Sequence, residues 1–421
     1  MSKYNELYNR IKKEITDRQI DYGKKLPSVR KASELYGVSR TTVQNAYFAL
    51  SADGYIISEP QSGYYVSYKK KKKSAESKAE NTADKIKFDF TTDTADRDSF
   101  DFNIWRRYIK SALRQDDKLL SYSEAQGELL LREAIADYIR EKRNVTASAD
   151  RIVIGAGVQT LLSVFCSLID NRGTVSFPDR SFVQGASLFS DYGFDVKYRN
   201  KDADIIYVTP SKMTRWGDVM PNKRRVELVA HSAQNGSLVI EDDFESDFLY
   251  NTKPTPSLHA LSGGSNVVYL GSFSKLLLPS IRISFMILTE ELAEKYKQNI
   301  FKFNQTASKT EQIALYKFIN DGHLKAQIRK TRRFYTAKTK LFAEKLKTEF
   351  PTANIEISEN ALQIIMKTDF NKDTDTFLQN GIKIFIDEYK NGRIKLCLNT
   401  SSISEKDFDS AVKSLKKSLD Y

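Results

Sequence analysis

The pattern of apolar and polar positions divides the chain into three regions. Over residues 1–68, apolar side chains first recur every three or four residues and then alternate, which predicts helices followed by two short strands. Residues 69–87 are charged and hold almost no large apolar side chain, so they cannot bury enough surface to offset the entropy lost on ordering. Over residues 88–421, short β-branched runs alternate with helical patterns. We therefore expect two folded domains joined by a flexible basic linker.

The first region predicts three helices. Apolar residues at every fourth position favour a helix over residues 4–18. A second helix begins at Pro27, because proline is favoured in the first turn, and ends at Gly37, which readily adopts a left-handed conformation. Ser39 caps a third helix over residues 40–53.

The third helix has one apolar and one polar face. Its predicted buried stripe consists of Val43, Ala46, Tyr47 and Leu50. Arg40, Thr41 and Gln44 remain on the opposite, N-terminal surface, where the first turns of a DNA-reading helix meet base edges. Arginine can bond guanine bidentately, and glutamine can do the same for adenine. Two alternating runs around a turn at residues 59–63 then predict a two-stranded wing.

Taken in order, these segments resemble the winged helix-turn-helix of the GntR superfamily. The matching segments are LPSVR (26–30), GVSRTTV (37–43), AYFAL (46–50), GYI (54–56) and GYYV (63–66). The resemblance implies that the protein binds double-stranded DNA. It places the following residues at the DNA: Arg30, Ser39, Arg40, Thr41, Thr42, Gln44, Ser62 and Gly63. The lysine run of the linker either adds contacts to phosphates or is a solvated spacer, and the sequence leaves both open.

Composition narrows the class of protein. The net charge of +12 suits a polyanionic partner, although a basic balance also serves solubility. Cys166 and Cys397 lie in apolar runs and suggest no disulfide framework, which fits a reducing compartment. Three scattered histidines make a zinc cluster or other metal site unexpected. With no signal-peptide pattern and no apolar stretch of about 18 residues, we expect a cytoplasmic protein without membrane contact.

The third region predicts an α/β domain. Its β-branched runs lie at residues 152–154, 205–208, 238–240 and 267–270, with helical patterns between them. This alternation favours a largely parallel sheet with crossover helices, and ligands of such sheets bind beyond the carboxyl ends of the strands. The glycines that follow the first run can present backbone N–H groups to a phosphate, or simply form a tight turn.

The loops after the third and fourth runs carry candidate chemistry. One carboxylate of the acidic run 241–247 could neutralise a cationic ring nitrogen, although a solvated loop would also explain the run. Lys275 stands between serines and apolar residues, a setting that suits an amine forming a Schiff base. Arg282 follows and can bind a phosphate bidentately. Together, the flanking serines, the arginine and the upstream acidic run favour a functional role for Lys275 over that of a surface charge.

In this order, the pieces resemble fold-type I aminotransferases over nearly all of residues 88–421, and the whole chain resembles the MocR group of the GntR superfamily. The matching segments are YSEAQG (122–127), LREAIA (131–136), VTPS (208–211), RR (224–225), EDDF (241–244), GSFSK (271–275) and PSIRIS (279–284). The resemblance implies a mostly parallel central sheet flanked by helices and a smaller C-terminal α+β subdomain. It also implies a head-to-tail homodimer formed by this domain.

The resemblance implies pyridoxal 5'-phosphate as cofactor. Lys275 would form the Schiff base, Asp242 would pair with the ring nitrogen, and Phe182 would stack on the ring. The implied phosphate contacts are Gly157, Val158, Gln159, Ser272, Arg282 and, from the neighbouring subunit, Tyr122. Ser274 is a further implied cofactor-binding residue. Arg393 matches the arginine that holds an amino-acid carboxylate, although a surface arginine at a strand edge is an open alternative.

The family pattern is broken on one side of the expected ring. Phe244 stands where relatives carry a tyrosine, and Thr214 stands where catalytic relatives carry an asparagine; both lost residues hydrogen-bond the phenolic oxygen of the cofactor. We expect the cofactor to bind while transamination is weak or absent. The alternative is that Lys212 or Arg215 supplies the missing donor.

Three functions follow. The first, which we favour, is a DNA-binding regulator that senses an amino compound or pyridoxal phosphate itself through Lys275. The second is an active aminotransferase with an attached DNA-binding domain, against which Phe244 and Thr214 argue. The third is a regulator whose large domain only dimerises without cofactor, against which Lys275, Ser272 and Arg282 argue. The effector, the operator, the regulated genes and the sign of regulation are not readable from the sequence.

Overall fold

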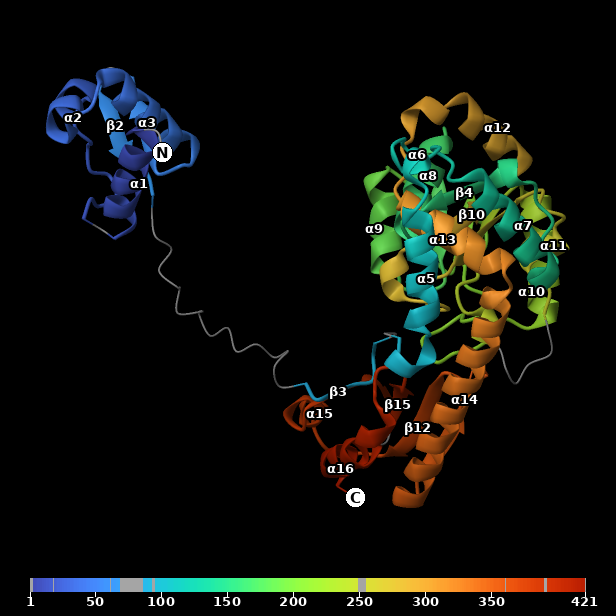
Figure 1. Ribbon diagram of the computed structural model, residues 1–421. Helices are drawn as coiled ribbons and strands as arrows, with labels where there is room; N and C mark the ends of the chain where they lie inside the picture. Colours follow the sequence, from blue (N-terminus) through green and yellow to red (C-terminus); the bar gives the residue numbers. More distant parts are fainter. Residues whose placement is uncertain are drawn as a thin grey trace. The chain divides into compact units, whose positions relative to one another are not determined.

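The computed structural model describes residues 3–17, 19–60, 62–68, 86–92, 95–248, 255–359, 361–389 and 392–420. The chain divides into two units, Met1–Thr82 and Ala83–Tyr421 (Figure 1). Of the expected linker, residues 69–85 lie outside the described residues.

The first unit is a three-helix domain with a wing. Its elements are helices α1 (Lys3–Thr16), α2 (Val29–Tyr36) and α3 (Arg40–Ala52) and the antiparallel strands β1 (Ile56–Glu59) and β2 (Gly63–Val66). The predicted stripe Val43, Ala46, Tyr47 and Leu50 is fully buried against α1. The three helices and the wing are thus confirmed.

The start of the second helix differs from the prediction. Ser28 is the N-cap, and its side chain accepts a hydrogen bond from the backbone N–H of Lys31 at 3.3 Å. Pro27 therefore precedes the cap instead of occupying the first turn, and its carbonyl accepts a hydrogen bond from the Tyr47 hydroxyl at 2.9 Å. The helix ends at Gly37 with φ 63°, as predicted.

The second unit is built on a seven-stranded sheet in the order β4-β10-β9-β8-β7-β5-β6. Its strands are β4 (Ile152–Gly155), β5 (Thr174–Phe177), β6 (Asp195–Tyr198), β7 (Ile205–Val208), β8 (Leu238–Asp242), β9 (Val267–Ser272) and β10 (Ser284–Ile287). All neighbouring pairs are parallel except the two that involve β10. The largely parallel sheet is confirmed.

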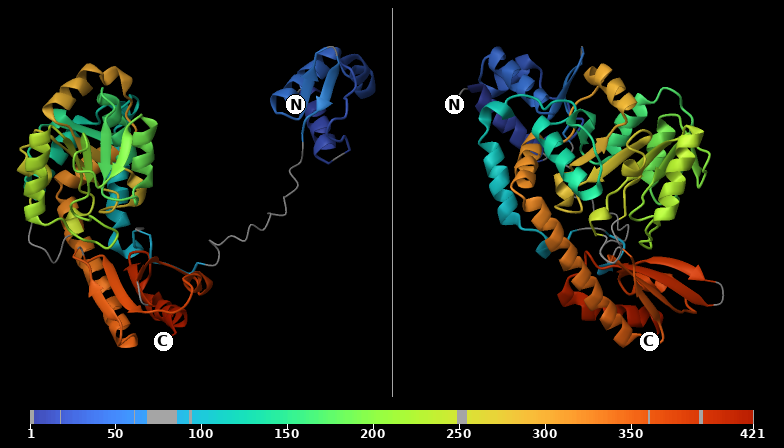
Figure 2. Two further views of the ribbon diagram at one scale, coloured as in Figure 1. Left: turned by 180° about the vertical axis from the view of Figure 1, so that it is seen from behind. Right: turned by 90° about the vertical axis from the view of Figure 1, so that its right-hand side faces the viewer.

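Helices cover both faces of this sheet (Figures 1 and 2). Alternate strand residues face opposite sides, as the pleat requires: Ile152 and Ile154 pack into one cluster, while Val153 packs into the other. The first cluster includes residues of α5 (Phe102–Leu113), α7 (Leu129–Arg143) and α13 (Lys309–Asn320); the second includes residues of α8 (Val158–Leu168), α9 (Val183–Asp191) and α12 (Glu290–Gln298). The shorter helices α6 (Asp116–Leu119) and α11 (Leu258–Leu261) and the longer α10 (Asn222–Asn235) complete this part.

The long helix α14 (His323–Glu349) leads into a smaller α+β subdomain (Figure 2). There the antiparallel strands β11 (Asn354–Ile357), β12 (Gln363–Asp369), β15 (Arg393–Asn399) and β14 (Phe385–Tyr389) lie in that order, with α15 (Asp375–Gln379) and α16 (Phe408–Leu419). The short strand β3 (Phe88–Asp89) pairs with β13 (Ile382–Lys383). The expected C-terminal subdomain is confirmed.

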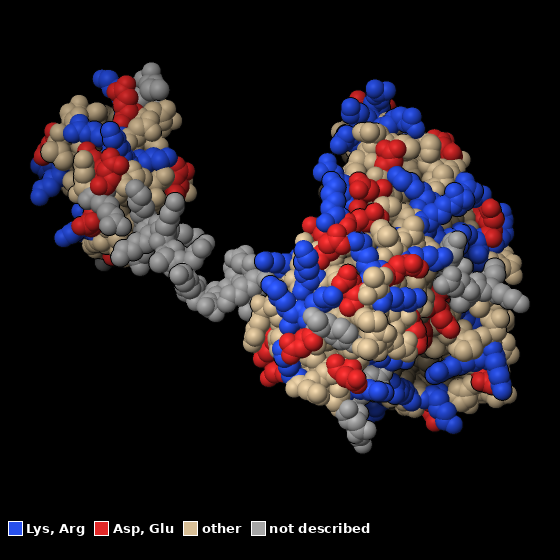
Figure 3. All heavy atoms as spheres, turned by 90° about the horizontal axis from the view of Figure 1, so that it is seen from below, with Lys and Arg blue, Asp and Glu red and all other residues tan. Residues whose placement is uncertain are grey.

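No helix among the described residues is long and apolar enough to cross a bilayer. On the face drawn in Figure 3, basic and acidic side chains are interspersed over the larger unit, so charge alone marks no DNA-binding face there.

Candidate functional site

A cavity of about 510 Å³ lies where β7, β8 and β9 end. It is lined by Thr91, Val158, Pro178, Asp179, Ser181, Phe182, Tyr207, Thr209, Lys212, Met213, Thr214, Arg215, Asp242, Phe244, Ser272, Ser274, Lys275, Pro279, Gln363, Phe385, Cys397 and Asn399. Residues of the large sheet and of the smaller subdomain thus share one cavity. Its position beyond the carboxyl ends of parallel strands matches the sequence-based expectation.

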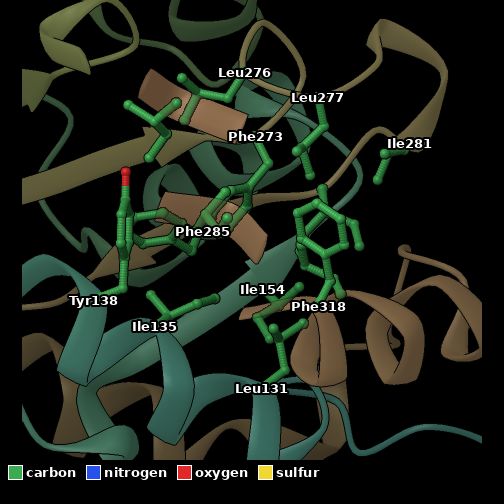
Figure 4. Close-up of a cluster of buried hydrophobic side chains, with 14 of the residues drawn as sticks. Leu131, Ile135, Tyr138, Ile154, Phe273, Leu276, Leu277, Ile281, Phe285 and Phe318 are labelled. Carbon is green, nitrogen blue, oxygen red and sulfur yellow. The ribbon is translucent and has the colours of Figure 1, made fainter. Parts of the chain in front are cut away.

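Lys275 extends into this cavity from the turn after β9. The neighbouring Phe273 and Leu276 are buried in the apolar cluster beneath the turn, which fixes the backbone on either side of the lysine (Figure 4). The Lys275 ammonium donates to the carboxylate of Glu245. The Lys212 ammonium lies 2.9 Å from the same Oε1 atom.

Asp242 ends β8 and is almost completely buried. Its Oδ2 accepts a hydrogen bond from the Tyr207 hydroxyl, whereas its Oδ1 has no hydrogen-bond partner among the described residues. Burial raises the pKa of Asp242 to about 7, and the neighbouring Asp243 and Glu245 carboxylates add to this rise against the opposing Tyr207 hydrogen bond. A buried carboxylate oxygen without a partner is costly, and a protonated ring nitrogen would satisfy it.

The turn before α8 fits a phosphate. Gly157 has φ 98°, and a Cβ at this position would lie 2.3 Å from Nη2 of Arg282, so the guanidinium lies directly against the glycine. The first turn of α8 begins at Val158 and has no side-chain cap. The Ser272 hydroxyl lies 3.1 Å from that of Ser284 and accepts from the Ser274 N–H at 3.3 Å. An uncapped helix start beside a guanidinium suits an anion.

The two positions that depart from the family pattern both line the cavity. The Thr214 hydroxyl donates to the Asp218 carboxylate and accepts from the Trp216 N–H at 3.2 Å, so its proton is already engaged. Phe244 carries no polar side-chain atom, and the Lys212 ammonium lies 5.8 Å from its ring centroid. The centroid of the Phe182 ring, which also lines the cavity, lies 5.4 Å from that of the Tyr207 ring.

Several expected cofactor residues lie outside the lining of the cavity. Gln159 is exposed on the first turn of α8, while Gly157 and Arg282 adjoin each other at its start. Tyr122 is fully exposed, as a residue directed at a neighbouring subunit would be in a single chain.

The structure does not bring Arg393 to the cavity. Arg393 opens β15, is exposed, and donates from Nε to Asp369 at 2.9 Å. The cavity is instead reached by Cys397 and Asn399, further along the strand. Arg393 precedes Cys397 by four residues in β15 and is not among the residues that line the cavity. This position fits the alternative of a surface arginine, and the carboxylate role of Arg393 stays a prediction.

Sequence reasoning missed Glu245 and Tyr207. Glu245 is completely buried. The signal available in the sequence was its place in an acidic run that directly follows an apolar strand run. Tyr207 reaches Asp242 because β7 and β8 are neighbours in the sheet, and no sequence pattern gives that strand order.

The candidate DNA interface lies on α3 and the wing. Arg40, Thr41 and Gln44 are exposed, and Ser39 caps the helix by accepting from the Thr42 N–H at 3.1 Å. Arg30, on α2, is exposed and lies 3.5 Å from Glu34. At the wing, the Ser62 hydroxyl lies 2.6 Å from that of Tyr65, and Gly63 adopts φ 116°.

Both units of the chain are similar to known proteins. Residues 3–66 match the gntR family of bacterial regulatory proteins, and residues 87–415 match aminotransferase class I and II. The HTH-type transcriptional regulator YdeL of Bacillus subtilis is 30% identical over 98% of this chain and 96% of its own. The probable rhizopine catabolism regulatory protein MocR of Rhizobium meliloti is 26% identical over 80% of this chain and 76% of its own.

The fold of the large unit recurs in solved structures. An archaeal alanine:glyoxylate aminotransferase superposes with a TM-score of 0.68 and 19% identity, covering 79% of this chain and 90% of that one. At this identity the likeness shows the fold alone.

Proposed function

Because this chain belongs to the MocR-type transcriptional regulators, in which a GntR helix-turn-helix is fused to a class I and II aminotransferase domain, we propose that it senses a small ligand through pyridoxal phosphate held at Lys275. The helix-turn-helix implies DNA binding as a regulator.

The single observation that carries the proposal is that Oδ1 of Asp242, in the cavity that Lys275 lines, has no hydrogen-bond partner in the described part of the chain. Pyridoxal phosphate supplies an aldehyde that an amine converts to a Schiff base, and a ring whose nitrogen becomes cationic. In this chain Lys275 would provide the amine and Asp242 the counter-charge for the ring nitrogen. Phe182 would pack against the ring.

The phosphate would lie at the start of α8. Its ligands would be the backbone at Gly157 and Val158 together with the Arg282 guanidinium and the Ser272 hydroxyl. Gln159 and Ser274 would adjoin this group. Tyr122 would reach the same phosphate in the other subunit of a head-to-tail homodimer, which its full exposure permits.

We further propose that the aminotransferase-like domain acts as a sensor and that its transaminase activity is weak or absent. Phe244 offers no hydrogen bond, and the Thr214 proton is engaged by Asp218. An amino compound that exchanges with Lys275, or the arrival of the cofactor itself, would act as effector by favouring one arrangement of the dimer over another. Twofold symmetric dimers read half-sites that mirror their symmetry.

The test is covalent trapping. Purified protein is incubated with pyridoxal phosphate and reduced with borohydride, and its peptides are analysed by mass spectrometry beside those of Lys275→Ala. We expect a stoichiometric adduct at Lys275 in the wild type and none at this site in the variant. An unmodified Lys275 with excess cofactor present would leave only a DNA-binding unit on a dimerising domain. Sustained turnover with a panel of amino donors and keto acids would instead support an active aminotransferase.

A further inference from the structure

The loop that follows β7 carries an arginine into the cavity wall. Arg215 is exposed and also lines the cavity, so its side chain lies where the cavity opens to solvent. Its guanidinium carbon lies 5.1 Å from the centroid of the Phe385 ring, which belongs to β14 of the smaller subdomain. In the described part of the chain, no carboxylate forms an ion pair with this guanidinium. Its N–H donors are therefore available to a ligand.

The backbone of Arg215 is held by the same subdomain. Its carbonyl accepts a hydrogen bond from Sγ of Cys397 at 3.4 Å. Cys397 is the cross-strand neighbour of Phe385, so the arginine contacts both members of one strand pair. At the next residue, the centroid of the Trp216 ring lies 3.8 Å from the Lys395 ammonium. The arginine is thus positioned before a ligand arrives, which lowers the entropy lost on binding.

Arg215 differs from the other basic residues considered for the site. Lys275 is the amine proposed for the Schiff base. Arg393 is outside the lining of the cavity and donates to the Asp369 carboxylate. Arg215 combines a place in the lining with a guanidinium that no described carboxylate neutralises. A guanidinium presents parallel N–H donors that match the two oxygens of a carboxylate.

We propose that Arg215 is a specificity-determining residue of the cavity and binds the carboxylate of an amino-acid effector. The amine of the effector points towards the cofactor at Lys275, and the Phe385 ring supports the guanidinium from the side of the subdomain. The effector class is then narrowed from amino compounds in general to those that carry a carboxylate. This inference rests on the proposed function and deepens it.

Paired ligands isolate the contribution of the carboxylate. The phosphopyridoxyl derivatives of glycine, β-alanine and γ-aminobutyrate place a carboxylate at increasing distance from the nitrogen. Those of methylamine, ethylamine and propylamine are the same molecules without the carboxylate. None contains an aldehyde, so binding requires no reaction with Lys275. Each is titrated by calorimetry into the cofactor-free full-length protein. In at least one pair, the wild type should bind the carboxylate-bearing ligand about tenfold or more tightly than its partner.

Arg215→Ala should lose most of this preference, while its affinity for the amine derivatives stays within about threefold of wild type. Arg215→Lys should keep part of the preference, because an ammonium attracts a carboxylate without binding it bidentately. Arg180→Ala is the matched control and should keep all of it. Arg180 is also exposed, and its guanidinium carbon lies 5.3 Å from the centroid of the Tyr198 ring, but it does not line the cavity.

Three results would overturn the inference. One is equal weakening of both ligands of every pair in Arg215→Ala, which would indicate a structural role or a hydrogen bond to the phenolic oxygen that all the ligands share. Another is a wild-type preference near unity in every pair. The third is a preference that Arg393→Ala removes and Arg215→Ala retains, which would assign the carboxylate to Arg393. Failure of the wild type to bind any of these ligands would instead refute the proposed function.

Discussion

The hydroxyl of Tyr207 donates to one carboxylate oxygen of Asp242 and leaves the other directed to no partner within the described part of the chain. Tyr207 is the last but one residue of β7 and Asp242 is the last residue of β8, and the two strands are parallel neighbours, so the sheet itself brings the side chains together. Tyr207 therefore orients the carboxylate that would face a ring nitrogen.

Tyr207→Phe should weaken cofactor binding without abolishing it. The variant removes one hydrogen bond to a charged group, a loss of about 1.5–3 kcal/mol. The half-saturating concentration of pyridoxal phosphate, measured by absorbance, should rise accordingly. Unchanged binding would show that Asp242 is oriented by its backbone alone.

Asp242 should make the cofactor-free protein less stable as pH rises. Its pKa is raised to about 7 from an ordinary value of 3.8, so folding favours the protonated acid. The cost of ionising it is absent below pH 4, grows between pH 4 and 7, and is constant above, with an upper bound of about 4 kcal/mol. The melting temperature of cofactor-free Asp242→Asn should rise relative to that of the wild type as the pH increases from 4 to 7. Parallel pH profiles would contradict the prediction.

Arg393→Ala should change little. Both side chains of its ion pair with Asp369 are exposed, and such surface pairs contribute about 0–1 kcal/mol to the free energy of unfolding. Melting temperature and the spectral response to amino acids should match wild type. A lost response confined to carboxylate-bearing amines would restore the carboxylate role that the resemblance implied.

Phe244→Tyr should return a hydrogen-bond donor to the cavity wall. General hydrogen-bond energetics place the gain at about 0.5–1.5 kcal/mol. We expect a shifted visible band on the loaded protein and faster half-transamination in a single-turnover assay. Phe244→Leu is the control, since it changes the ring without adding a donor.

Arg40→Ala should weaken binding to a specific operator by about 1–3 kcal/mol if the side chain contacts a base. Loading with pyridoxal phosphate should be unaffected, because the two functions belong to separate units. Arg10→Ala, which removes an exposed arginine of α1 lying 3.3 Å from Glu14, is the matched control. Affinity can be measured by electrophoretic mobility shift on genomic fragments selected with the wild type.

Periodicity predicted most of the fold because burial alternates regularly in regular elements. The stripe on α3 and the four core strand runs are such cases. The site was less predictable because its contacts join distant segments. Lys275 and Asp242 could be recognised from the residues around them in the sequence. The ion pair between Glu245 and Lys212 could not, because it depends on how the loop that carries Lys212 is placed in the tertiary structure. The position of Arg393 outside the cavity lining was unpredictable for a related reason. A strand pattern shows on which face a residue lies, whereas its distance along the strand from the cavity depends on the tertiary structure.

The short strand β3 has a mechanical consequence. It fastens the chain that follows the linker to β13, the carbonyl of Phe90 accepts from the Asn399 N–H at 3.0 Å, and Thr91 already borders the cavity. The start of the second unit is thus built into the wall of the cavity. Any change in the shape of the cavity at Thr91 or Asn399 would therefore be felt directly by the segment that begins this unit.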